Sequence, residues 1–283
     1  MTATDGDSYL DSKPAKQNLI FWQGLWKVRG DIPKRFYLLA LFLSILLLFF
    51  IWSILTYGGF VKDLVLPSPT AVFQRGAEML RDGSLVVDAK ASLWRIACGF
   101  LLSALLSIPL GLLVGSFRSI HGLLGWIVEA LRYIPPSAFV PLSIVWVGFG
   151  EIQKIAIIFL GTFFYNTLMI ANAVKFVPSD LIRVSYTLGA TEKDVFFDVI
   201  FPAALPKIID VLRTNIATAW NSLVIAELVA SSSGLGYRVL VAQRFYKTDV
   251  IFVVLFVIGS IGLITDLIFK LIFRLVVPWS IEK

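Results

Sequence analysis

Long apolar stretches alternate with shorter polar segments along the chain, and each apolar stretch has the length of a membrane span. A helix needs about 20 predominantly apolar residues to cross the hydrocarbon core of a bilayer. The pattern therefore predicts an all-α integral membrane protein with about six transmembrane helices. The expected spans are Phe36–Tyr57, Ser92–Gly115, Gly122–Val147, Ile152–Val174, Leu205–Val229 and Val250–Val276.

The segment Pro178–Pro202 lies between two expected spans but is polar and amphipathic. Leu181, Val184, Ser185 and Leu188 recur at helical spacing, which predicts a short helix with one distinct face. The segment therefore interrupts the membrane pattern with a structured element outside the bilayer.

Two local signals divide this segment. Gly189 suits the left-handed residue that ends a helix. Thr191, with Asp194 three residues later, predicts a capping box at the start of a second helix. Two short helices joined at a glycine indicate a surface that binds a partner.

Basic residues orient the spans, because the cytoplasmic loops of membrane proteins carry an excess of Lys and Arg. Here basic side chains are concentrated in the N-terminal segment, in alternate loops and near the C-terminus. This distribution predicts that both termini and the Pro178–Pro202 segment are cytoplasmic. Residues 1–35 would form a cytoplasmic tail, and residues 58–91 a periplasmic segment with a helix over Ala71–Leu80.

The N-terminal tail has two interpretations. Phe21, Trp22, Leu25 and Trp26 recur at helical spacing, which fits a helix lying on the inner leaflet, and a simple linker fits as well. The tail lacks the apolar core and small-residue cleavage site of a signal peptide.

The composition narrows the function. Hydrophobic residues make up 58% of the chain and charged residues 16%. In a soluble domain about half of the residues are apolar and about a quarter are charged. The net charge of +6 comes without a basic tract or an RNA-binding motif, so nucleic acid is not an expected partner. Cys98 is the single cysteine, which leaves no disulfide and no cysteine-based metal site.

The sequence contains no recognisable catalytic motif. A phosphate loop is absent, so this chain is not expected to bind ATP in that manner. His121 is the only histidine and is interpreted as a surface residue at the start of a helix. Neither a nucleophile elbow nor zinc-ligand spacing occurs. We expect no enzyme activity, catalytic residue, metal site or cofactor in this chain.

Polar residues inside the expected spans have alternative interpretations. Glu129 and Arg132, like Asp210 and Arg213, are three residues apart and can pair on one helix face. Other polar residues mix with small ones, which fits either close helix packing or the lining of a pathway. The candidate pathway residues are Asn166, Asn215, Thr218, Trp220, Asn221 and Glu227.

The Pro178–Pro202 segment resembles the cytoplasmic coupling motif of binding-protein-dependent ABC transporter permeases of the type I importer fold. The motif begins with Glu-Ala-Ala, continues to a glycine and ends in Ile-x-Leu-Pro. Gly189 and Pro202 fall in register with it. The opening triplet here is Arg183-Val184-Ser185, which departs from the motif and lacks its acidic residue.

Other stretches add to the resemblance. Ser92-Leu93-Trp94-Arg95 resembles the start of the family's core domain, which implies that residues 88–276 form that domain. Arg132-Tyr133-Ile134-Pro135-Pro136, Ala226-Glu227 and Gly234-Leu235-Gly236-Tyr237 resemble the subgroup that imports nitrate, sulfonates, taurine or bicarbonate.

The resemblance implies the partners of the chain. A homodimer in the bacterial cytoplasmic (inner) membrane would form the pathway for a small anionic solute. Two separate cytoplasmic ATPase subunits would bind ATP and Mg, and a periplasmic or lipid-anchored binding protein would deliver the solute. Residues implied in contact with the ATPase are Arg183, Ser185, Thr187, Leu188, Gly189, Ala190, Thr191 and Asp194.

Two other classes remain as alternatives. A secondary transporter needs no ATPase, but it favours midplane charges and internal repeats, and the sequence shows few of the former and none of the latter. A membrane scaffold would recruit a partner without transport, and the polar residues of the fifth expected span argue against it.

Overall fold

The computed structural model describes residues 33–280, and this range contains helices and no strand, which confirms the all-α prediction. The chain divides into two compact units, residues 1–62 and 63–283. The interfacial helix considered for the N-terminal tail lies outside the described residues.

The described part of the first unit contains one helix, α2 (Lys34–Tyr57). Its side chains are apolar on all sides and almost all are exposed. A helix that is hydrophobic all round belongs in lipid or in a protein interior. Its bounds agree with the helix expected over Phe36–Tyr57, and it is long and apolar enough to cross a membrane.

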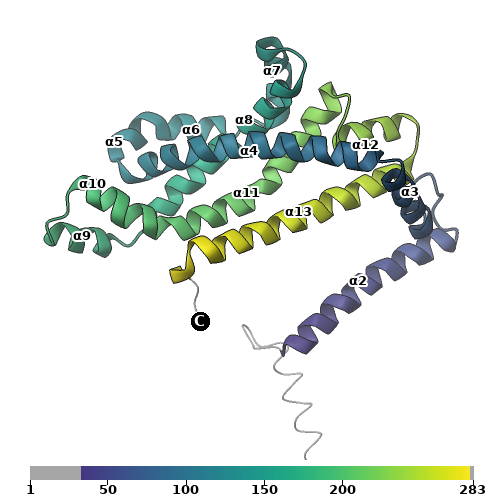
Figure 1. Cartoon of the computed structure of the whole chain (residues 1–283), viewed down its shortest axis with the longest axis horizontal. Coiled ribbons are helices and arrows are strands. Elements are labelled where there is room, and N and C mark those ends of the chain that lie inside the picture. The colour runs from purple at the N-terminus through teal and green to yellow at the C-terminus, as the bar shows by residue number, and fades with distance from the viewer. Residues whose placement is uncertain (1–32, 281–283) are drawn as a thin grey trace, which may run out of the picture. The chain divides into compact units, whose positions relative to one another are not determined.

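The second unit is built on three long helices, α4 (Ser84–Ser116), α8 (Glu151–Lys175) and α11 (Phe201–Ala230). They pack against one another in its centre (Figure 1). A Cβ atom on Gly99 of α4 would lie 2.7 Å from Ile158 Cβ of α8, and one on Gly111 would lie 2.8 Å from Ile170 Cβ. Glycines therefore let the two backbones approach closely, as at many membrane helix interfaces.

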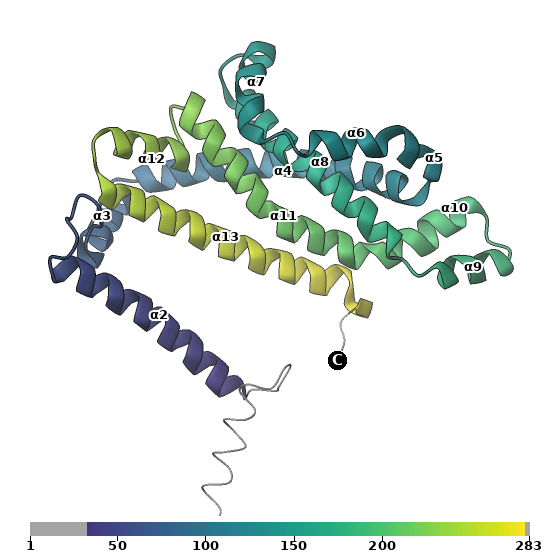
Figure 2. The ribbon, with the colours of Figure 1, turned by 180° about the vertical axis from the view of Figure 1, so that it is seen from behind.

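Helix α13 (Thr248–Val276) runs along α11 in both ribbon views (Figures 1 and 2). It is joined to α11 through α12 (Leu235–Arg244) and contacts α3 (Pro69–Arg81). An ion pair of 2.7 Å between Arg75 and Asp249 links α3 to α13. Helix α3 confirms the helix expected over residues 71–80.

The expected third span is wrong as one straight helix. Residues 118–131 and 136–147 form two helical segments that meet at an angle of 84°. The first comprises α5 (Arg118–Ile120), a π-helical turn (His121–Gly125) and α6 (Trp126–Leu131). The second comprises a 3₁₀ turn (Pro136–Ala138) and α7 (Phe139–Val147). Two successive prolines explain the break, because proline lacks an N–H and disfavours helix in the residue before it.

Helix α4 also begins earlier than expected, at Ser84 rather than Ser92. Gly83 precedes it with φ +76°, and the Asp82 carboxylate accepts the Ser84 N–H at 2.8 Å. These local contacts start the helix inside the segment that was expected to be periplasmic, so its first turns extend beyond the apolar stretch.

The described range has fewer apolar spans than the six expected. Helices α2, α4, α8 and α13 are long and apolar enough to cross a membrane, and the bent pair would make five. Helix α11 has 30 residues but too many polar ones. Asn215, Ser222 and Glu227 are buried against other helices of the chain, which is how polar groups are tolerated at membrane depth.

The Pro178–Pro202 segment forms α9 (Ser179–Thr187), a turn and α10 (Glu192–Asp194) at one end of the second unit (Figures 1 and 2). The second short helix is not separate. Helix α10 continues through a π-helical stretch (Val195–Ile200) directly into α11. Pro202 is the second residue after this π-helical stretch, and the helix continues through it without a break.

Candidate functional site

The turn between α9 and α10 is fixed by backbone geometry. Gly189 has φ +89°, the left-handed conformation in which glycine is favoured. The Ala190 N–H donates to the Ser185 carbonyl at 3.0 Å, and the Gly189 N–H donates to the Tyr186 carbonyl at 3.0 Å. This pair of bonds is a Schellman motif, so the predicted role of Gly189 in ending the helix is confirmed.

A capping box starts α10, as the sequence predicted. The Thr191 hydroxyl and N–H both donate to Asp194 Oδ2, at 2.7 and 2.8 Å, and the Asp194 N–H donates back to the hydroxyl at 3.4 Å. The hydroxyl bond, with the backbone bond after it, holds the pKa of the Asp194 carboxyl below its usual value. Across the turn, the Tyr186 hydroxyl donates to Glu192 at 2.7 Å. The turn is therefore pre-organised.

One face of α9 is bound to the rest of the chain and the other is bare. Ile182 and Ala190 pack against the core cluster that contains Val195 and Ile200. The bare face presents Leu181, Val184 and Leu188, which are 48%, 57% and 83% exposed. Three exposed apolar side chains therefore lie in one row on this face.

The other predicted coupling residues surround this face. Arg183, Thr187 and Thr191 are exposed and Ser185 is partly exposed. The Ser185 and Thr187 hydroxyls donate to the carbonyls of Leu181 and Arg183 in their own helix. The Arg183 side chain is the one charged group among these four.

A second site, which the sequence did not predict, surrounds Arg95 of α4. Its guanidinium is 2% exposed and donates to Glu151 of α8 at 2.6 and 2.7 Å, to Glu227 of α11 at 2.6 Å, and to Ser233. The Ser233 carbonyl accepts at 2.7 Å and its hydroxyl at 3.0 Å. One side chain thus ties together α4, α8, α11 and the turn before α12. We call this cluster the Arg95 hub.

The hub also fixes the turn that leads into α12. Glu227 accepts the Gly236 N–H at 2.7 Å and the Ser92 hydroxyl at 2.8 Å. Gly234 has φ +115° and donates its N–H to Asp88 at 2.9 Å. A Cβ on Gly234 would collide with the Glu227 carboxylate, so this position requires glycine for both conformation and space.

The charges of the hub balance. Its cations Arg95, Lys154 and Arg238 pair with the carboxylates of Glu151, Glu227 and Asp88. Buried charges are tolerated when they are paired and hydrogen-bonded. The hub therefore holds helices together and offers no vacant group to a ligand.

Comparison with known proteins identifies the architecture. The family model described as "Binding-protein-dependent transport system inner membrane component" matches residues 107–280. The chain belongs to this family of membrane permeases. The permease is thus a transport subunit of an ABC importer and a multi-pass protein of the inner membrane; it is not itself an enzyme, since ATP hydrolysis belongs to a separate subunit in this family.

Named relatives cover most of the permease. A probable ABC transporter permease of Brucella abortus is 40% identical over 81% of this chain and 90% of its own length. The taurine transport system permease TauC of Escherichia coli is 34% identical over 82% of this chain and 86% of its own length. The nitrate import permease NrtB of Synechocystis is 30% identical over 83% of this chain and 88% of its own length.

The fold is that of a solved importer. The MetNI methionine ABC transporter in an inward-facing conformation matches with a TM-score of 0.61 and 22% identity, covering 68% of this chain and 96% of that one. These findings place the permease among ABC importers rather than secondary transporters or scaffolds.

Four of the six predicted pathway residues are buried within the permease. Asn215 donates to Asn166 at 2.8 Å, and Asn166 donates to Ser103 at 3.2 Å, which links α11, α8 and α4. Trp220 is 6% exposed, and Glu227 belongs to the Arg95 hub. Their position fits the packing interpretation in this conformation. Their role in a pathway stays a prediction.

Of the remaining two, Thr218 is partly exposed and Asn221 is exposed. Asn221 belongs to a stripe along α11 in which accessible residues recur at alternating spacings of four and three. The stripe residues are Ala203, Lys207, Asp210, Thr214, Ala217 and Asn221. Polar and small side chains on a membrane helix face a cavity or another protein surface rather than lipid acyl chains.

The two ion pairs expected within helices have different outcomes. Arg132 donates to the Tyr133 hydroxyl at 2.9 Å and lies over its ring. It forms no ion pair with Glu129 within the described range, so that expectation is wrong. The Asp210–Arg213 pair is present at 4.0 Å, but the shorter contact of Arg213 is to Asp266, at 2.5 Å.

Proposed function

We propose that two copies of the permease form the translocation pathway of an ATP-driven importer for a small oxyanion, with both termini and the α9–α10 turn on the cytoplasmic side. Each copy would contact one ATPase subunit, which binds ATP and Mg, and a solute-binding protein would deliver the oxyanion from outside. The names of the relatives that handle taurine and nitrate support this class of solute.

The bare face of α9 carries this proposal. Leu181, Val184 and Leu188 point away from the permease on a turn that is fixed on both sides. Burying one such side chain against a partner contributes about 1.5–3 kcal/mol. Because α10 runs into α11 without a break, a displacement at this face would be transmitted along the longest continuous helix of the unit.

The stripe on α11 supports a dimer. Thr214 and Asn221 would be costly in contact with lipid acyl chains, but they are suitable in a water-filled pathway between two copies. In this arrangement the ATPase would move α11, and α11 would line the solute path. The missing acidic residue of the coupling motif leaves Arg183 to make a different contact, with a carboxylate or a backbone carbonyl of the ATPase.

The experiment is ATPase stimulation by loaded binding protein in the assembled complex. Gly189→Val places a β-branched residue at φ +89°, where no neighbour obstructs it but its backbone is strained. We expect stimulation to fall by about tenfold or more, since 1.4 kcal/mol of strain corresponds to a factor of ten. Gly189→Asn is the matched control, because asparagine tolerates this region.

A second variant tests the bare face itself. Leu188→Glu should abolish co-purification of the ATPase, whereas Lys90→Glu, an exposed change elsewhere on the permease, should not affect it. Undiminished stimulation in Gly189→Val together with normal co-purification in Leu188→Glu would remove α9 from the proposed interface.

Uptake into vesicles tests the pathway and the solute class. Asn221→Leu should reduce vanadate-sensitive uptake of a taurine or nitrate probe while leaving the ATPase bound. Equal uptake by the variant and the original chain would show that the α11 stripe does not line the path. If neither taurine nor nitrate is transported, the proposed solute class is overturned, but the proposed ATPase contact is not.

A further inference from the structure

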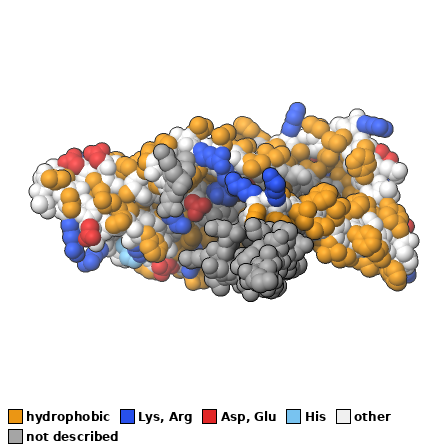
Figure 3. Space-filling view, turned by 90° about the horizontal axis from the view of Figure 1, so that it is seen from below, with side chains coloured by type: hydrophobic (Ala, Val, Ile, Leu, Met, Phe, Trp, Pro, Cys, Tyr) orange, Lys and Arg blue, Asp and Glu red, His pale blue; other side chains and the backbone are white. Residues whose placement is uncertain are grey.

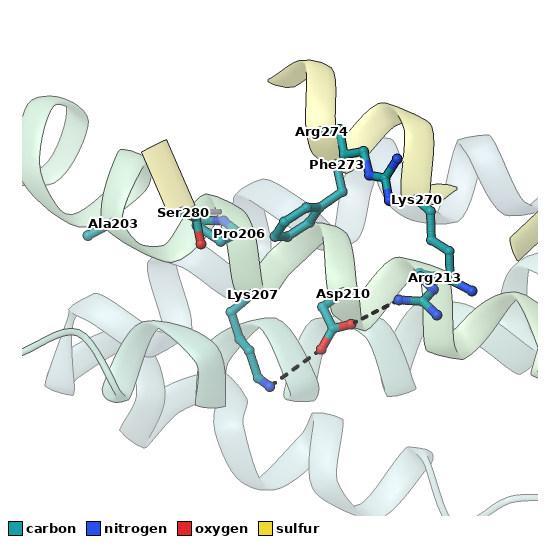
Figure 4. Close-up of a pocket in the computed structure, with 9 residues that line it drawn as sticks. All are labelled: Ala203, Pro206, Lys207, Asp210, Arg213, Lys270, Phe273, Arg274 and Ser280. Carbon is teal, nitrogen blue, oxygen red and sulfur yellow. Dashed lines mark hydrogen bonds and ion pairs between the residues drawn. The ribbon is translucent and has the colours of Figure 1, made fainter. Parts of the chain in front are cut away.

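A cleft opens between α11 and α13, near the N-terminal end of one helix and the C-terminal end of the other. It has a volume of about 560 Å³. Figure 4 shows side chains from both helices around it. The lining residues are Ala203, Pro206, Lys207, Asp210, Arg213, Lys270, Phe273, Arg274 and Ser280.

The cleft carries more positive than negative charge. Lys207, Arg213, Lys270 and Arg274 are four cations, and Asp210 is the one carboxylate in the lining. Asp266, beside the cleft, adds a second. Two cations are therefore in excess.

The carboxylates are already engaged. Asp266 holds Arg213 at 2.5 Å and Lys270 at 2.8 Å, while Asp210 lies 3.5 Å from Lys207 and 4.0 Å from Arg213. Within residues 33–280, no carboxylate lies within ion-pair distance of Arg274. With no such partner among the described residues, its guanidinium can bind an anion with two parallel hydrogen bonds.

The position of the cleft points to the membrane surface. Leu263, Leu267, Leu271 and Leu275 form an exposed apolar row along α13, from 57% to 72% exposed. Lys270 and Arg274 alternate with the last two members of that row, so the cations lie where the apolar helix leaves the bilayer. The space-filling view shows Lys and Arg gathered in one region among extensive hydrophobic surface (Figure 3).

The position of an aromatic residue supports placing the cleft at the level of the lipid headgroups. Trp279 follows the end of α13 and is 63% exposed, and tryptophan is enriched at the level of lipid headgroups. Phe273 and Pro206 give the cleft an apolar wall, against which an acyl chain or glycerol backbone can lie.

We propose that this cleft binds an oxyanion, and that its source is the phosphate of an acidic phospholipid such as phosphatidylglycerol. Basic pockets between membrane helices on the cytoplasmic side recognise such headgroups. The bound phosphate would lie against cations supplied by both α11 and α13 and thereby help to hold the two helices together. The assignment to the cytoplasmic leaflet rests on the orientation in the proposed function, whereas the binding itself does not.

The experiment uses the assembled complex in nanodiscs of phosphatidylcholine with and without phosphatidylglycerol. Lipid that remains bound after detergent extraction is measured by native mass spectrometry. We expect selective retention of phosphatidylglycerol. The double variant Lys207→Gln/Arg274→Gln should lose this selectivity by about 30-fold, since each cation near an anionic surface contributes about fivefold.

The matched control is Lys62→Gln/Lys90→Gln, which removes the same charge from exposed positions outside the cleft and should retain selectivity. Equal loss in the control, or equal retention of both lipids by the original complex, would overturn the lipid assignment. Binding of sulfate in phosphatidylcholine nanodiscs, lost in the cleft variant, would assign the oxyanion to a soluble source instead. Co-purification of the ATPase is measured in parallel, so a failure of assembly is recognised separately.

Discussion

Helix α11 carries charged groups near both of its ends, and the two ends accommodate them in opposite ways. Near its C-terminus, Glu227 is fully buried in the Arg95 hub, where three cations meet three carboxylates. Near its N-terminus, Lys207, Asp210 and Arg213 border an open cleft, and their side chains are 62%, 47% and 34% exposed.

This difference separates a structural role from a recognition role. A buried guanidinium whose donors are all used cannot bind anything further, but it fixes the helices that supply the acceptors. An open cluster with excess charge contributes little to the fold, because solvent screens its pairs, and it remains able to bind an anion.

The two ends also suggest how α11 would work in the proposed mechanism. The helix is continuous from Glu192 of α10 to its end beside the hub. One end is anchored to α4 and α8 through Arg95, while the other carries the turn proposed to contact the ATPase. A rigid element anchored at one end and displaced at the other converts a local movement into a change along the pathway.

The largest effect is expected when the anchored end is broken. Glu227→Ala leaves the buried Arg95 without one of its two carboxylate partners. Removing one member of a buried ion pair lowers the free energy of unfolding by about 3–5 kcal/mol. We expect a large fall in the thermal unfolding temperature of the purified permease in detergent.

Glu151→Ala is the comparison variant, because Glu151 binds the same guanidinium but its side chain is 53% exposed. Water can replace part of that contact, so the loss should be clearly smaller. Equal losses in the two variants would show that burial does not distinguish the two halves of the hub.

A smaller effect is expected from crowding the turn of the hub. Gly234→Ala strains the backbone at φ +115° and pushes the new Cβ against the Glu227 carboxylate. Residues forced into such conformations cost about 1–3 kcal/mol. The unfolding temperature should fall, though less than in Glu227→Ala.

Gly83→Ala separates the two causes. Gly83 also has positive φ, +76°, but a methyl group added there would meet no atom within 4 Å. It should therefore show the backbone cost without the collision. Equal losses in Gly83→Ala and Gly234→Ala would mean that the Glu227 carboxylate moves aside freely and that the collision costs nothing.

The sequence predicted features that depend on neighbours along the chain. Gly189 and the Thr191–Asp194 capping box were correct because helix ends are decided by a few adjacent residues. The break at Pro135-Pro136 was missed although its signal was present, because the apolar run through residues 122–147 outweighed it. Hydropathy measures composition and is insensitive to the direction of the helix.

The Arg95 hub was missed for a different reason. Arg95 and Glu227 are separated by 132 positions, and neither has an oppositely charged residue three or four positions away on its own helix. The available signal was a pair of opposite charges in two separate expected spans, since ionisable groups at membrane depth need partners. Which residues meet is decided by helix packing, through contacts such as Gly99 on Ile158.

The smallest effect on the fold is expected at the open cleft, where Asp266 pairs with Arg213 and Lys270. These side chains are one third to one half exposed, and pairs of this kind contribute about 0–1 kcal/mol. Asp266→Asn should therefore leave the unfolding temperature almost unchanged. It releases two cations into the cleft, so retention of phosphatidylglycerol should rise about fivefold.

Glu78→Gln is the control for Asp266→Asn, because Glu78 is also an exposed partner of an arginine, Arg75, but lies outside the cleft. It should alter neither property. A fall in stability as large as that of Glu227→Ala would make the cleft a second structural hub and would remove the contrast between the two ends of α11. Unchanged stability with stronger anion binding would establish that α11 is anchored at one end and open to a ligand at the other.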